Sequence, residues 1–97
     1  MKKTNAYQEI ITRLEDAQIN EKKVMVIITS KHLHLSTLLH CFIEVCNHAT
    51  RCTVRLEVDG LDISELWLTD DCVNAYFEYD DVMVIEYDDT IISFSVE

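Results

Sequence analysis

The stretch CTVRLEVDG, residues 52–60, decides how this chain is expected to fold. Apolar side chains occupy every second position of it, at Cys52, Val54, Leu56 and Val58. This period of two is typical of a half-buried β-strand. Asp59-Gly60 follows directly and can supply the positive φ angles of a tight type I′ turn. The stretch therefore predicts a strand and the turn of a β-hairpin.

The alternation continues towards the C-terminal end. The return strand begins at Leu61, and Leu66 and Leu68 then fall on the opposite parity, which predicts a β-bulge near residues 64–65. Three more strands, separated by Asp-rich turns, are expected over residues 73–79, 82–87 and 90–96.

Residues before this region predict a helix and a strand. Apolar residues recur at helical spacing over residues 5–18, and Thr4 or Asn5 can cap the first backbone amides. Residues 23–29 contain the unalternating run VMVII, which suits a strand that is covered on both faces. We therefore expect this strand to be central in its sheet.

The next segment predicts a second helix. Its apolar stripe consists of Leu35, Leu38, Leu39, Phe42, Ile43, Cys46 and Ala49. Ser30 or Ser36 is the candidate cap, and Cys46 is interpreted as a small core residue. Residues 32–35 alternate like a strand, so the preceding strand could also continue up to Ser36.

Together these elements predict one α+β domain that covers residues 1–97. The expected order is α-β-α-β-β-β-β-β, with two helices packed on one face of a mostly antiparallel sheet that ends in a C-terminal meander. A chain of 97 residues, 48% of them hydrophobic, can form one core but is too short for two.

Charge is distributed very unevenly along the chain. The first 55 residues carry eight Lys and Arg and five Asp and Glu, whereas residues 56–97 carry thirteen Asp and Glu and neither Lys nor Arg. The net charge of −10 thus belongs to the second segment. Such a field favours a basic partner and disfavours direct binding of nucleic acid, which is itself a polyanion.

The acidic residues occur in a repeated arrangement. Residues 78–81, EYDD, recur as residues 86–89. In a meander, Asp70-Asp71 and Asp88-Asp89 should lie at one end of the sheet, and Asp80-Asp81 at the other. Residues two apart on a strand are separated by roughly 6.5 Å, near the spacing of successive phosphates, so the acids could imitate a nucleic-acid backbone. The alternative is that each Asp only stabilises its turn or prevents sheet aggregation.

The candidate partner-binding residues all lie in this meander. They are Asp70, Asp71, Tyr76, Glu78, Asp80, Asp81, Glu86, Asp88 and Asp89. Parity places Tyr76 and Glu78 on the outer face, because Tyr79 shares the parity of Phe77 and is expected to be buried against the helices.

Metal and catalytic sites are less well supported. His40, Glu44 and His48 would be spaced by one helical turn, with Cys52 near in sequence, and could bind zinc, but neither a Cys-x-x-Cys pair nor His-Glu-x-x-His occurs. There is no phosphate loop, serine elbow or dinucleotide fingerprint, so we expect no cofactor, no metal and no enzymatic activity.

The sequence does not show the pattern of a signal peptide or of a membrane-spanning segment. Polar residues follow Met1-Lys2-Lys3 where a signal peptide would be apolar, and the longest apolar run is too short to span a bilayer. We expect a cytoplasmic protein, a monomer or homodimer that does not bind membranes, with four free thiols.

In size, charge and compactness the chain is similar to phage-encoded nucleic-acid mimics, including some anti-CRISPR and anti-restriction proteins. No family motif supports this similarity, so it assigns no residue roles. The expected function is a small acidic inhibitor that binds the basic surface of a DNA- or RNA-handling protein. The alternatives are an immunity protein or antitoxin that neutralises a basic nuclease toxin, and an acidic chaperone or scaffold.

Overall fold

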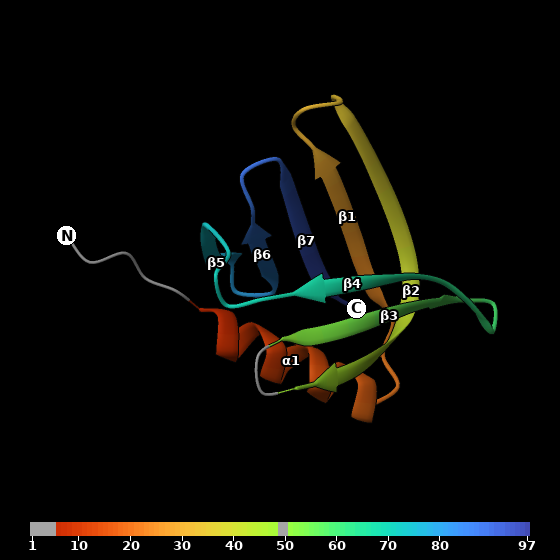
Figure 1. Ribbon diagram of the computed structural model, residues 1–97. Coiled ribbons are helices and arrows are strands. Elements are labelled where there is room, and N and C mark those ends of the chain that lie inside the picture. The colour runs from red at the N-terminus through yellow and green to blue at the C-terminus, as the bar shows by residue number, and fades with distance from the viewer. Residues whose placement is uncertain (1–5, 49–50) are drawn as a thin grey trace.

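The computed structural model describes residues 6–48 and 51–97, which form a mostly-β domain (Figure 1). In these residues there is one helix, α1 (Tyr7–Ile19). The seven strands are β1 (Val24–Ser30), β2 (Leu35–Asn47), β3 (Cys52–Val58), β4 (Leu61–Leu68), β5 (Asn74–Tyr79), β6 (Val82–Glu86) and β7 (Thr90–Val96). They make one antiparallel sheet in the order β4-β3-β2-β1-β7-β6-β5.

The prediction of a second helix is wrong, because the segment in question forms the long strand β2. The apolar residues of this segment fit both periods, and its core-facing positions Leu39, Cys41, Ile43 and Val45 also alternate like a strand. β1 bonds to β2 and to β7 along its whole length, so it is central as predicted. A helix at residues 35–47 would leave one edge of β1 without these hydrogen bonds.

Two details that depended on the second helix are corrected as well. Ser30 does not cap a helix; its Oγ accepts a hydrogen bond from the Leu33 amide in the β1–β2 turn. Ser36 lies within β2, and Cys46 is exposed rather than buried in the core. All four cysteines are free thiols, as expected.

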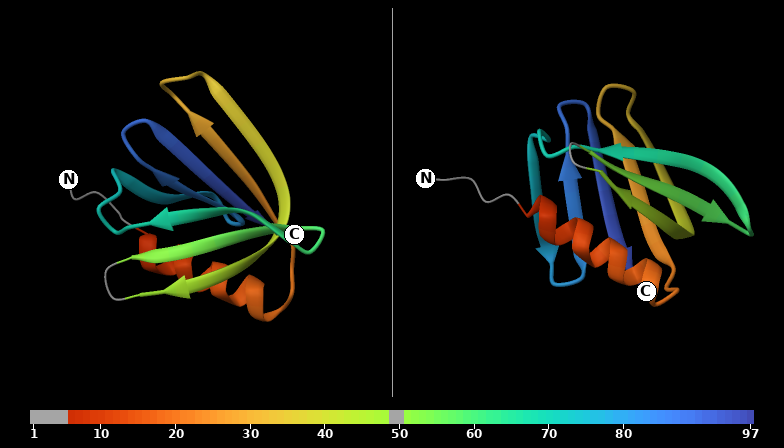
Figure 2. Two further views of the ribbon diagram at one scale, coloured as in Figure 1. Left: turned by 45° about the vertical axis from the view of Figure 1, so that its right-hand side comes forward. Right: turned by 60° about the horizontal axis from the view of Figure 1, so that its bottom comes forward.

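The sheet curls around α1, as the views in Figure 2 show. The buried side of α1 consists of Tyr7, Ile10, Ile11, Leu14 and Ala17, and it joins one core cluster with the inward side chains of the strands. The helix extends to Ile19, and Ala6 is its N-cap residue, without a side-chain hydrogen bond. The proposed caps Thr4 and Asn5 lie outside the described residues.

Strand β2 divides the sheet into two halves, because it changes its partner between Cys41 and Phe42. Residues 35–41 pair with β1, and residues 42–47 pair with β3. We call β5, β6, β7, β1 and residues 35–41 the meander half, and residues 42–47 with β3 and β4 the hairpin half. The two edge strands of the sheet are β4 and β5.

The C-terminal hairpins agree with the alternating pattern, with one exception. Asp59 and Gly60 both have positive φ, 53° and 81°, as the type I′ prediction required. The bulge lies at Ile63, one residue before the predicted position. Tyr79 was expected to be buried but is 67% exposed, because a second irregularity between Phe77 and Tyr79 shifts its parity.

Within the described part of the chain, none of the helical structure is long and apolar enough to cross a bilayer.

Candidate protein-binding interface

The acidic residues of the meander turns lie at two ends of the sheet, as predicted from the alternation of successive turns between these ends. At one end, the β6–β7 turn carries Asp88 and Asp89, and the Lys31 amide donates a hydrogen bond to the Asp89 carbonyl over 2.8 Å. The link between β4 and β5 reaches the same end, because the Thr69 amide donates to the Tyr87 hydroxyl over 3.0 Å. Asp70 and Asp71 follow Thr69 in this link.

The other end carries the β5–β6 turn with Asp80 and Asp81. Arg13 of α1 lies beside this turn: its Nη1 donates to the Asp80 carbonyl over 3.0 Å, and its guanidinium stacks 4.8 Å from the centre of the Phe77 ring. Because β6 connects the two turns, Asp81 and Asp88 are roughly 23 Å apart along the strand at about 3.3 Å per residue.

Tyr76 lies between these two ends on the outer face of β5. It pairs with Val84 of β6, and its neighbours there are Glu78 and Glu86. Burial, and then the nearby charges of Glu86 and Glu78, raise the pKa of the Tyr76 hydroxyl above its ordinary value. The structure therefore brings these three predicted residues together. One acidic end of the sheet consists of Asp70, Asp71, Asp88 and Asp89, and the other consists of Asp80 and Asp81.

Ion pairing differs sharply between the two halves of the sheet. In the hairpin half, Arg55 lies between three carboxylates, 3.3 Å from Glu44, 3.8 Å from Asp62 and 3.6 Å from Glu65. In the meander half, Lys31 approaches Glu86 at 4.0 Å, and His40 contacts the carboxylate of Glu97 at 3.1 Å. The acids of the hairpin half are thus partly neutralised by a central arginine.

Nine of the thirteen acids in residues 56–97 form no ion pair with a described residue. Seven of the nine lie on β5 or in the meander turns: Asp70, Asp71, Glu78, Asp80, Asp81, Asp88 and Asp89. The negative charge that remains uncompensated is therefore concentrated on the meander.

Two of these acids also stabilise their own turns. The Asp71 carboxylate accepts a hydrogen bond from the Thr69 hydroxyl, and Asp89 accepts one from the Thr90 hydroxyl over 3.2 Å. Among the described residues, the carboxylates of Asp70, Asp80, Asp81 and Asp88 have no such bond. Turn stabilisation therefore accounts for part of the acidic set but not for all of it.

The residues considered for zinc do not have the spacing that suggested a metal site. His40 and Glu44 lie on the extended strand β2, where residues four apart are separated by roughly 13 Å at about 3.3 Å per residue. Cys52 points into the core, where burial raises the pKa of its thiol to about 11. Within the described residues, no three His, Cys, Asp or Glu side chains are grouped closely enough to hold a metal ion.

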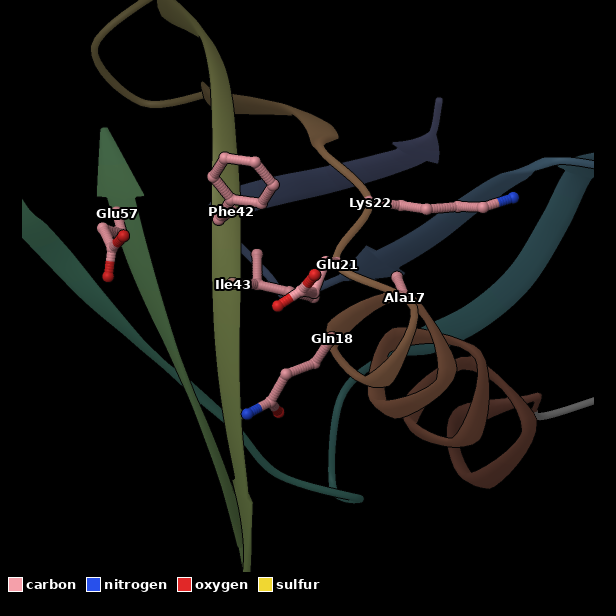
Figure 3. A pocket seen from close by; sticks show the side chains of 7 residues that line it. All are labelled: Ala17, Gln18, Glu21, Lys22, Phe42, Ile43 and Glu57. Carbon is pink, nitrogen blue, oxygen red and sulfur yellow. The ribbon is translucent and has the colours of Figure 1, made fainter. Parts of the chain in front are cut away.

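Sequence reasoning missed a groove of about 460 Å³ beside the end of α1 (Figure 3). Gln18 of α1 and Glu21, in the turn after the helix, point towards β2, which contributes Phe42 and Ile43, and the Val45 amide donates to Gln18 Oε1 over 2.8 Å. The groove lies where β2 changes its partner from β1 to β3. The sequence could not indicate it while these residues were expected to be helical.

No protein-family model matches this sequence, and comparisons with curated proteins and with solved structures give no match either.

Proposed function

We propose that the protein is a small acidic inhibitor that binds the basic surface of a nucleic-acid-handling protein in the cytoplasm and occupies the place of the nucleic acid. The observation that carries the proposal is the concentration of unpaired acids on the meander, while Arg55 compensates the hairpin half. A surface selected only for solubility would carry mixed charge on both halves.

The geometry favours recognition of an extended basic site. The two acidic ends are separated by roughly 23 Å along β6 and flank a face that carries Tyr76, an aromatic residue with a polar tip. A basic groove that normally holds nucleic acid presents Lys and Arg over a comparable length. An immunity protein against a basic nuclease toxin would use the same surface, and only the identity of the partner separates these two functions.

The first experiment is affinity capture from host lysate at low and at moderate salt, with identification of the eluted proteins by mass spectrometry. Electrostatic capture should weaken steeply as salt rises, whereas apolar docking by a chaperone or scaffold should not. The captured protein is then loaded with labelled nucleic acid and titrated with the inhibitor. Displacement should reach a sharp stoichiometric end point; turnover of many target molecules by one chain would contradict the proposal.

Charge reversal localises the interaction. Asp81→Lys with Asp88→Lys should weaken the complex by at least about tenfold, mainly through slower association, because rim charges steer the encounter. The matched control is Glu9→Lys with Asp16→Lys, which reverses two exposed charges on α1. Equal losses in the two variants would show that overall charge, and not the meander, determines binding.

A further inference from the structure

The outer surface of the meander half, turned away from α1, carries few charged side chains. The strand register places fifteen side chains there in three rows that cross the strands. The middle row runs Leu38, Ile27, Ser93, Val84 and Tyr76. The residues there that can carry charge are Glu86 and His40, in the two flanking rows, and Glu78, which lies near Tyr76 at the irregularity of β5. We call these three rows the outer face.

Val84 is shielded from solvent although it faces away from the core around α1. Its side chain is only 2% exposed, yet it does not belong to the core cluster around α1. Its cross-strand neighbours Tyr76 and Ser93 therefore bury it on the outer side. Met25, Ile27 and Ile91 share this side, and Leu38, at the end of the row, is 60% exposed.

The hairpin half gives an internal comparison. Nine side chains point outward there, and five of them are charged: Glu44, Arg55, Glu57, Asp62 and Glu65. Both halves belong to one sheet of a chain in which 27% of residues are charged, so composition does not explain the difference. Depletion of charge in the centre with charge at the rim is the usual anatomy of a protein interface.

We propose that the outer face is the centre of the partner interface, and that the partner presents an apolar ridge flanked by Lys and Arg. This inference rests on the proposed function, because the acidic turns at both ends of the face require a basic rim on the partner. The face alone covers about 400–500 Å², from a strand spacing of roughly 4.8 Å and three rows about 6.6 Å apart. A standard interface covers about 800 Å² per partner, so the acidic turns must contribute the remainder.

A second copy of the chain fits this surface less well. Each copy carries a net charge of −10, so face-to-face association would bring two strongly acidic molecules together. A basic partner would instead neutralise the acidic ends while its apolar ridge covers Leu38, Ile27 and Val84.

The test uses the full chain and a short synthetic peptide in which leucine alternates with arginine. A second peptide with serine in place of leucine controls for charge. Titration of the isotope-labelled protein, followed by amide chemical shifts, should show changes on β1, β7 and β6 with the leucine peptide, and weaker binding with the serine peptide.

Two matched variants separate the face from the rest of the surface. Leu38→Asn should weaken binding of the leucine peptide about tenfold, since burial of a leucine contributes roughly 1.5–3 kcal/mol. Leu61→Asn changes a leucine of similar exposure, 70%, on β4 of the hairpin half and should leave binding unchanged. Thermal melts establish that both variants remain folded.

The outcomes distinguish this inference from the proposed function. The inference would be overturned if the chemical shifts changed only in the turns and Leu38→Asn had no effect, or if the leucine peptide did not bind. The proposed function would then still be tested by the charge-reversal variants. Binding that depends on Leu38 but responds neither to salt nor to Asp81→Lys with Asp88→Lys would overturn the proposed function. A wild-type dimer in sedimentation that Leu38→Asn dissociates would assign the face to a second copy.

Discussion

Tyr7 connects α1 to the far end of β4 through a buried hydroxyl. Its Oη donates to the Leu68 carbonyl over 2.8 Å, and burial, followed by nearby Cys52 and Tyr87, raises its pKa from 10.0 to about 12. The folded protein therefore keeps this proton while the unfolded chain releases it above about pH 10. The stability that it contributes is complete below pH 10 and is lost as the pH rises towards 12.

Tyr7→Phe should lower the free energy of unfolding at neutral pH by about 1 kcal/mol, because the Leu68 carbonyl loses its donor. The loss of stability between pH 10 and 12 should be smaller in this variant than in the wild type. Urea unfolding across this range measures both effects. Tyr79→Phe, at a 67% exposed position, is the control, and an alkaline loss identical in all three proteins would show that Tyr7 is not the responsible group.

Arg55 compensates three acids from its position in the middle of the hairpin half. Each contact joins exposed side chains and contributes little alone, but removal of the cation leaves Glu44, Asp62 and Glu65 to repel one another. Arg55→Met should destabilise the protein by roughly 1 kcal/mol at low salt and by less at high salt, because salt screens the repulsion. Arg51→Met, which removes a cation stacked 4.2 Å from Trp67, is the control and should show little salt dependence.

The extended conformation of β2 makes a direct prediction for thiol chemistry. Cys46 is exposed on the strand, whereas Cys41, Cys52 and Cys72 are buried, and burial raises the pKa of the Cys41 and Cys52 thiols. A maleimide reagent should therefore label one thiol rapidly in the native protein, and Cys46→Ser should abolish this fast phase. Slow labelling of all four thiols would instead indicate that residues 35–47 bury Cys46, as the rejected helix would.

Elements whose structure is determined by residues close together in the sequence were the predictable ones. The hairpin at residues 52–68 was predictable because alternation and Asp59-Gly60 determine it within a few residues. Strand β2 was not, since its apolar residues satisfy both periods and the requirement of β1 for a neighbouring strand decides between them. The prediction for Tyr79 was wrong because a single irregularity reverses the side to which the last residue of β5 points.

The candidate interface was predictable to a similar degree. Counting turns was sufficient to place Asp70-Asp71 and Asp88-Asp89 at one end and Asp80-Asp81 at the other. The pairing of Arg55 with three acids and the low charge of the outer face could not be predicted without the strand order. This order depends on the pairing of β1 with β7, which is distant from it in the sequence.

The whole chain carries its net charge of −10 on a compact body, and most of the unpaired acids of residues 56–97 lie on β5 or in the meander turns. Self-repulsion should therefore oppose folding of the free protein, and salt should relieve it, because the Debye length falls from about 30 Å at 0.01 M to about 10 Å at 0.1 M. The melting temperature should rise by several degrees over this range. The same salt should weaken the complex with a basic partner, so the two measurements should respond in opposite directions.

A variant with asparagine at residues 70, 71, 80, 81, 88 and 89 tests whether the meander is the source of this repulsion. It removes six of the ten net negative charges, and asparagine remains a favourable turn residue that can still accept the hydrogen bonds from Thr69 and Thr90. The variant should melt higher than the wild type at low salt and respond less to added salt, while losing affinity for the partner. A salt response as large as that of the wild type would mean that the acids are too far apart to repel one another. The concentration of charge on the meander would then no longer support a binding role.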